Sequence, residues 1–212
     1  MNLEKYQQYS RIARGLEKAD LVLKNARIVN VFTEEIIRGD IAIQDGIIAG
    51  IGSFHGKEER DLAGRYVCPG FIDSHLHLES TLVTPAELVT VASRHGTTTF
   101  IVDPHESANV SGLAGIDYIL DQTEDVKANV YVMMPSCVPA TAIDDNGCTL
   151  TAEDMAPYLH NSRILGLGEV MDSISVVQGE KSMHDKLELF EGRIRDGHAP
   201  FLEEGDLQAY AM

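Results

Sequence analysis

Residues 70–79 read Gly-Phe-Ile-Asp-Ser-His-Leu-His-Leu-Glu, an apolar stretch that ends in two histidines two positions apart. Side chains at positions i and i+2 of a strand point to the same face, so His75 and His77 can reach one ion together. A bare His-x-His is as often a pair of surface loop residues. The Asp, Ser and Glu in the same short segment favour a site.

Short apolar segments alternate with helical ones after this stretch. The further strands are expected at 97–102, 129–134, 164–168 and 192–196. The helices are expected at 85–92, 115–123, from 151, near 183–191 and after 203. Such alternation predicts an α/β fold with a parallel sheet, either a barrel or an open doubly wound sheet.

The segment before residue 68 has a different pattern. Residues 3–18 place Leu3, Tyr6, Ile12 and Leu16 among polar residues, which predicts an amphipathic helix that packs on the outside of something larger. Asp45-Gly46 separates two apolar segments and predicts a hairpin within a small antiparallel sheet. We therefore expect three parts, which are an N-terminal helix (1–18), a partial small β domain (19–67) and a partial α/β barrel (68–212).

Polar side chains follow the other predicted parallel strands. Asp103, His105 and Glu106 come after the second strand, Glu169 after the fourth and His198 after the fifth. Each alone could be a solvated loop or turn residue. Because parallel strands end at one face, the four polar ends predict a single cavity lined with imidazole and carboxylate groups. Those groups are the ligands of a catalytic divalent metal.

The composition excludes several classes of protein. Of 212 residues, 44% are hydrophobic and 24% charged, which is typical of a globular domain and not of a disordered chain. The 17 basic and 33 acidic residues give 17 − 33 = −16, the wrong sign for binding nucleic acid or an anionic membrane. Three irregularly spaced cysteines and the lack of an apolar run of about 18 residues favour a cytoplasmic protein.

Other catalytic motifs are missing from the sequence. It contains neither a phosphate-binding Gly-Lys-Ser/Thr loop nor a Gly-x-Ser-x-Gly elbow. Cys137 has no evident base, so a buried, unreactive thiol is the favoured interpretation. His77-Leu78-Glu79 matches half of the signature of the zinc-dependent nucleobase deaminases, but the three cysteines form no Cys-x-x-Cys. That mechanism is excluded.

Five segments, at residues 69–80, 103–110, 135–141, 168–171 and 196–200, together resemble the adenine deaminase family of the amidohydrolase superfamily. The resemblance extends from about residue 19 to the end of the chain. It implies a TIM-like metal-dependent hydrolase barrel preceded by part of a small β-sandwich domain. It also implies hydrolytic deamination of adenine to hypoxanthine and ammonia in purine salvage, and a homo-oligomer for the complete protein.

The resemblance implies a role for each candidate residue. His75 and His77 would bind one metal, Glu169 would bridge two metals as the catalytic carboxylate, and His198 would bind the second metal. Asp103, His105 and Glu106 would line the substrate side. The two divalent ions would be manganese or iron, and the donor types also allow zinc.

The chain has fewer βα units than a complete barrel. His75 to Met212 is 212 − 75 + 1 = 138 residues, whereas a full barrel takes about 200 or more. We expect about five of eight units, with unpaired edges on the first and fifth strands, and with proton-transfer groups beyond residue 212. We therefore expect the isolated chain to be marginally stable and inactive. A hydrolase of cyclic amides and a non-catalytic remnant are the alternatives.

Overall fold

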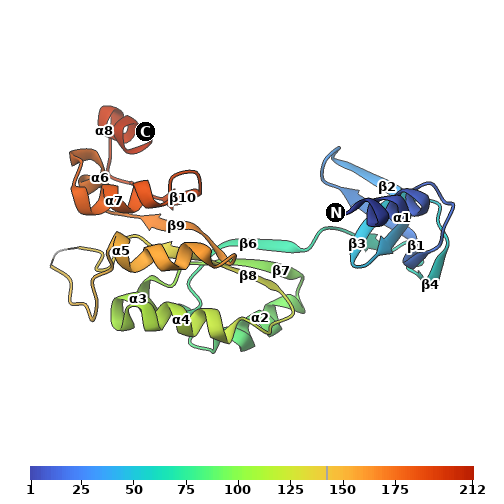
Figure 1. Ribbon diagram of the computed structural model, residues 1–212, viewed down its shortest axis with the longest axis horizontal. Coiled ribbons are helices and arrows are strands. Elements are labelled where there is room, and N and C mark those ends of the chain that lie inside the picture. Colours follow the sequence, from blue (N-terminus) through green and yellow to red (C-terminus); the bar gives the residue numbers. More distant parts are fainter. Residues whose placement is uncertain (142) are drawn as a thin grey trace. The chain divides into compact units, whose positions relative to one another are not determined.

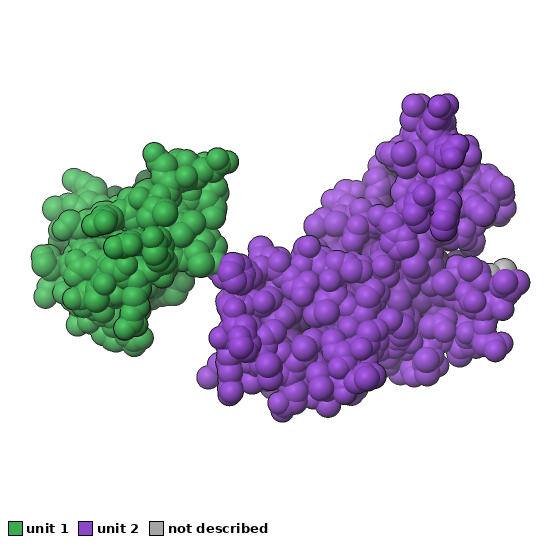
Figure 2. Space-filling model, turned by 180° about the vertical axis from the view of Figure 1, so that it is seen from behind, with its two compact units in different colours: residues 1–69 green, residues 70–212 purple. Residues whose placement is uncertain are grey.

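The computed structural model describes residues 1–141 and 143–212. The chain divides into two compact units, Met1–Pro69 and Gly70–Met212, which are coloured separately in Figure 2. Each unit has buried apolar clusters of its own. No helix among the described residues has the length and apolar character needed to cross a membrane.

The first unit is a helix on a mixed β-sheet. Its elements are α1 (Leu3–Ala13), β1 (Ala19–Asn30), β2 (Glu35–Gln44), β3 (Ile47–Gly52), β4 (Gly56–Asp61) and β5 (Tyr66–Val67). The order is β3-β2-β1-β4, and β5 also pairs with β1. β1, β2 and β3 are antiparallel, whereas β4 and β5 run parallel to β1. The expectation of a purely antiparallel sheet is therefore wrong, because the chain crosses from β3 to the far side of β1.

The predicted hairpin and helix are both present, and the helix differs in detail. Asp45 and Gly46 have φ of 50° and 74°, as the hairpin turn requires. α1 ends at Ala13 rather than at residue 18, because Gly15 takes a left-handed conformation with φ of 71°. Its buried side chains are Tyr9 and Ile12, which lie on one helix face. Leu3, Tyr6 and Leu16, expected on the packed face, are exposed.

The second unit is a curled parallel sheet with helices, as predicted for a partial TIM-like barrel (Figure 1). Its strands are β6 (Phe71–Leu76), β7 (Thr97–Val102), β8 (Asn129–Pro135), β9 (Ile164–Val170) and β10 (Ile194–Gly197). Among the described residues the order is β10-β9-β8-β7-β6, and every pair is parallel. The first and fifth strands are thus the edges, as expected.

The helices of this unit follow the predicted pattern with two differences. They are η1 (Glu79–Thr81), α2 (Pro85–Ser93), α3 (His105–Ser111), α4 (Leu113–Gln122), α5 (Ala152–Met155), η2 (Ala156–His160), α6 (Ser173–Gln178), α7 (Lys181–Leu189) and α8 (Glu204–Tyr210). The single helix expected at 115–123 is preceded by α3, from which Gly112, with φ of 60°, separates it. The short α6 was not predicted.

The core of the second unit lies between the sheet and these helices. Phe100, Met134 and Leu167 on the strands and Ile116 and Phe190 from the helical layer are almost fully buried. At the edge strand β6, by contrast, Ile72 is 64% exposed. The sheet thus buries its central strands well and leaves the apolar side chains of its edges in solvent.

The sheet curls enough to bring side chains of its two edge strands together. In a flat sheet β6 and β10 would lie about 19 Å apart, four strand spacings. His75 Nδ1 on β6 nevertheless lies 3.7 Å from Asp196 Oδ2 on β10. The curl therefore gathers the polar residues at the strand ends.

Candidate metal centre

Each candidate residue lies at the carboxyl end of a parallel strand. His75 is in β6 and His77 directly follows it, so the strand geometry places both imidazoles on one face. Glu169 is the penultimate residue of β9, and His198 follows β10. His105 is the first residue of α3, after β7. Sequence reasoning expected this convergence from strand ends alone.

The carboxylate of Glu169 is the centre of the cluster. Its Oε1 lies 3.3 Å from His75 Nε2 and 3.5 Å from His198 Nε2. Its Oε2 lies 3.3 Å from His77 Nε2 and also 3.3 Å from His105 Nδ1. The Nε2 atoms of His75 and His77 are 3.2 Å apart. Four imidazole rings from three parts of the chain thus surround one carboxylate.

The donor set suits a divalent transition metal. His75, His77 and Glu169 offer ligand atoms that all lie within 4.8 Å of one another. Neutral imidazole and carboxylate are the ligands that zinc, manganese and iron accept. Among the described residues, the buried Nδ1 atoms of His77 and His105 and both oxygens of Asp103 have no hydrogen bond of good geometry. Because buried polar atoms are normally paired, these atoms show that the protein alone does not satisfy the polar groups of the cluster.

His105 is held between two carboxylates. Its Nδ1 lies 2.5 Å from Oδ1 of the fully buried Asp103, and its Nε2 accepts a hydrogen bond of 3.5 Å from the backbone N–H of Cys137. A neutral imidazole that accepts at Nε2 carries its proton at Nδ1. Burial raises the pKa of Asp103, and the neighbouring His105 opposes that rise. The proton at Nδ1 thus faces Asp103 and Glu169, which makes His105 a poor metal ligand in this tautomer.

A second pair of carboxylates lies behind His77. Glu106 Oε2 is 3.1 Å from His77 Nδ1, and Ser80 Oγ donates to Glu106 Oε1 at 2.7 Å. Glu79 Oε1 accepts from the backbone N–H groups of Glu106 and Ser107, each at 3.1 Å. A carboxylate on the far nitrogen of a ligating histidine fixes the ring and raises its basicity. Sequence reasoning assigned no role to Glu79 or Ser80, although both directly follow the His-x-His segment.

The charges around His77 shift the pKa values of its neighbourhood in opposite directions. Burial lowers the pKa of His77, but the carboxylates of Glu106 and Glu169 outweigh it and the net pKa is raised. Burial raises the pKa of Glu79. For Glu106, burial is outweighed by the hydrogen bond from Ser80, and its pKa is lowered. The raised pKa of Glu79 and the lowered pKa of Glu106 thus differ in direction, although both carboxylates lie beside His77.

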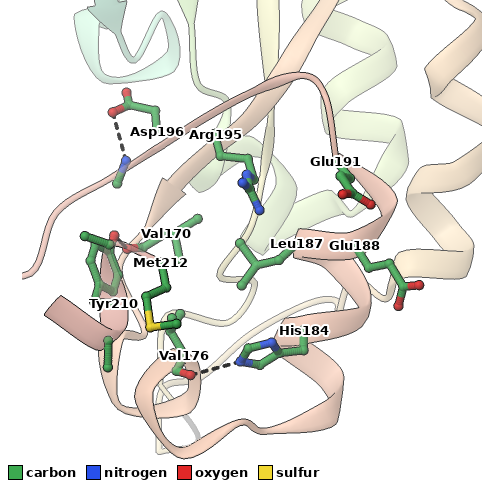
Figure 3. Close-up of a pocket in the computed structure, with 13 residues that line it drawn as sticks. Val170, Val176, His184, Leu187, Glu188, Glu191, Arg195, Asp196, Tyr210 and Met212 are labelled. Atoms are coloured by element: carbon green, nitrogen blue, oxygen red, sulfur yellow. Dashed lines mark hydrogen bonds between the residues drawn. The ribbon is translucent and has the colours of Figure 1, made fainter. Parts of the chain in front are cut away.

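The hollow drawn in Figure 3 lies beside this cluster. It has a volume of about 800 Å³, and residues of β9, β10, α6, α7 and α8 line it. Its wall includes Val170 and Gly197, the chain neighbours of Glu169 and His198. His184 lies there with Nε2 2.9 Å from the carbonyl oxygen of Val176 (Figure 3).

The fold and the cluster of histidines around a carboxylate define a metal-dependent hydrolase scaffold. Residues 66–205 match the amidohydrolase family, and the chain belongs to that family. A solved structure, the atrazine chlorohydrolase of Arthrobacter aurescens complexed with zinc, shares the fold with a TM-score of 0.50 and 15% identity. That likeness covers 65% of this chain and 41% of the chlorohydrolase.

The chain is also similar to curated adenine deaminases, which confirms the resemblance inferred from the five segments. It is 57% identical over its whole length to the adenine deaminase of Desulfitobacterium hafniense. It is 48% identical over 94% of its length to adenine deaminase 2 of Carboxydothermus hydrogenoformans. The chain spans 37% and 35% of these relatives, or slightly more than a third of their length.

Proposed function

We propose that this chain provides part of the active site of an adenine deaminase, which hydrolyses adenine to hypoxanthine and ammonia. The observation that carries the proposal is the convergence of His75, His77, His105 and His198 on the carboxylate of Glu169. The similarity to adenine deaminases supports the choice of substrate. The high negative charge is compatible with a neutral base such as adenine as the substrate. We place the protein in purine salvage in the cytoplasm, as a homo-oligomer when complete.

Four residues would hold two divalent ions in this proposal. His75 and His77 would bind one ion, His198 the other, and Glu169 both, because its carboxylate lies within 3.3–3.5 Å of all three imidazoles. Manganese or iron is the expected metal, and the donor types also accept zinc. When bound, such ions lower the pKa of water towards about 7, which supplies a nucleophile at neutral pH.

The remaining residues would position these ligands and hold protons. Glu106 would orient His77 through Nδ1, and Asp103 would orient His105, whose Nδ1 proton faces Glu169. Contact of Asp103, His105 and Glu106 with the substrate stays a prediction. The proposal assigns none of these residues as the acid that protonates the leaving nitrogen.

A chimera tests the proposal directly. This chain replaces the 212 aligned residues of the Desulfitobacterium hafniense enzyme, and ammonia release from adenine is measured with Mn²⁺. We expect turnover, and we expect His75→Ala to abolish it and to lower the metal content. His160→Ala is the matched control, since His160 is exposed and outside the cluster.

The chimera also separates the alternatives. Turnover of a cyclic amide in place of adenine would refute the deaminase assignment and favour another amidohydrolase activity. A folded chimera that binds metal but turns over neither compound would favour a non-catalytic remnant. Equal metal content in the His75→Ala and His160→Ala variants would refute the assignment of the ligands.

A further inference from the structure

Glu169 has an unusual backbone conformation for the residue at the centre of the cluster. Its φ is 35°, in the left-handed region that residues with a Cβ rarely occupy. Such a conformation persists where the surrounding structure holds it, and it occurs most often at functional sites. At Glu169 it sets the direction from which the carboxylate meets the four imidazoles. The groups that hold this backbone are therefore part of the site.

Ser136, the residue after β8, bonds to the backbone on both sides of the Cα atom of Glu169. Its N–H donates to the carbonyl oxygen of Gly168 at 3.2 Å. Its hydroxyl donates to the carbonyl oxygen of Glu169 at 2.8 Å. The Ser136 side chain is fully buried, so water cannot replace either bond. Ser136 alone thus fixes the two carbonyl groups that flank the left-handed residue.

Three further side chains contact Ser136 or Val170, the residue after Glu169. Lys186, buried on α7, donates from Nζ to the carbonyl oxygen of Ser136 at 2.7 Å. The Sγ of Cys137 is 3.1 Å from Ser136 Oγ and accepts from the backbone N–H of Asp172 at 3.4 Å. The hydroxyl of Tyr210 on α8 donates to the carbonyl oxygen of Val170 at 2.6 Å (Figure 3). Three consecutive carbonyls, of residues 168–170, are therefore held by Ser136 and Tyr210, which belong to two other segments of the chain.

We propose that Ser136 is a positioning residue for the metal centre, which holds Glu169 in its left-handed conformation so that its carboxylate faces the imidazoles. Lys186 and Tyr210 support it from outside the cluster. The effect on metal binding rests on the proposed function, whereas the constraint on the backbone of Glu169 does not. None of these three side chains is among the candidate ligands.

Two measurements on the 212-residue chain test the inference. The first is hydrogen–deuterium exchange of residues 164–172 without metal, and the second is Mn²⁺ affinity by calorimetry. We expect Ser136→Ala to speed the exchange of this segment and to weaken Mn²⁺ binding about tenfold, with Tyr210→Phe intermediate. The control is Ser93→Ala, which removes a similar hydroxyl-to-carbonyl bond, from Ser93 to Val89, within α2 and away from the cluster.

The two measurements separate the role of Ser136 from the metal site of the proposed function. Unchanged exchange in Ser136→Ala would overturn the inference, whether or not the chain binds Mn²⁺. Faster exchange with unchanged Mn²⁺ affinity would make Ser136 a merely structural residue and refute its positioning role. If the parent chain loads no Mn²⁺ while Ser136→Ala still speeds exchange, the metal site of the proposed function fails and the backbone constraint stands.

Discussion

Gly168 is the residue on which the packing against the cluster depends most, and Gly168→Ala tests this directly. A Cβ at position 168 would overlap Asp103 Oδ2 and lie 2.8 Å from Asp103 Cγ and 2.7 Å from Met133 Cβ. Real Cβ atoms do not approach other atoms so closely, so either Asp103 or the strand must move. Asp103 is fully buried and lies against His105, and β9 is an inner strand of the sheet. Moving either Asp103 or β9 would therefore cost free energy.

The expected cost follows from these contacts. Overpacking a core costs about 1–3 kcal/mol, and displacing the buried Asp103 carboxylate from His105 adds about 1 kcal/mol or more. We expect Gly168→Ala to lower the free energy of unfolding by about 2–4 kcal/mol, a large part of a typical total of about 5–15 kcal/mol. Mn²⁺ affinity should fall as well, because His105 and Glu169 flank the added methyl group.

Urea unfolding followed by circular dichroism measures this cost, since the chain has no tryptophan. Gly205→Ala is the control, because a Cβ there meets no atom within 4 Å and the residue is in α8. It should be neutral or stabilise by up to about 1 kcal/mol. In an Asp103→Ala background, the cost of Gly168→Ala should shrink to that of the Met133 contact. A Gly168→Ala chain within about 0.5 kcal/mol of the parent would refute the reasoning.

Three further predictions concern the ion pairs and the sheet edges. Asp40 accepts from Lys24 Nζ at 2.5 Å and from two backbone N–H groups, so Asp40→Asn should cost about 2–4 kcal/mol in unfolding free energy at pH 7. Burial raises the pKa of Asp40, but the hydrogen bonds outweigh burial and hold this pKa below 3.8. The stability that Asp40 contributes is therefore present above that pH and is lost as the pH falls below it. The unfolding free energies of the parent and of Asp40→Asn should converge on acidification. Glu106→Gln should weaken Mn²⁺ binding about tenfold, because Glu106 orients His77. This loss is at the low end of the range for such partners of a ligating histidine, because Glu106 is half exposed. An equal loss of Mn²⁺ affinity in Glu87→Gln, at an exposed glutamate, would contradict this prediction. The isolated chain should self-associate at micromolar concentration through β6 and β10, and a monomer with one cooperative thermal transition in sedimentation and calorimetry would contradict this.

The parts of the fold that sequence predicted are those governed by local patterns. Alternation placed His75 and His77 on one face, and Asp45-Gly46 defined the hairpin, because both depend on neighbours in the chain. The parallel pairing of β4 with β1 was missed, since no local pattern states which distant strand a segment joins. The break at Gly112 was missed because His105 to Ser111 carries no strong helix periodicity.

The candidate site divides in the same way. The strand-end rule predicted that His75, His77, Glu169 and His198 would converge, and the structure brings their polar atoms together. Ser136 was not singled out, because its bonds to Glu169 join residues 33 positions apart. The burial of Asp103 was not predicted either. An aspartate that follows a strand is usually exposed, and the sequence does not show that Gly168 packs against it.

The curl of the sheet, which brings side chains of β6 and β10 together, gives the candidate metal centre a structural role. His75 and His77 belong to one edge, His198 follows the other, and they are 198 − 75 = 123 positions apart in the chain. With His75 and His77 on one ion, His198 on the other and Glu169 on both, the two ions together would resist flattening of the sheet. Since the two ions would bind the curled state alone, a free ion at 100 times its dissociation constant would add about 2.7 kcal/mol against opening. The metal would then preserve the curvature of the scaffold, besides any role in catalysis.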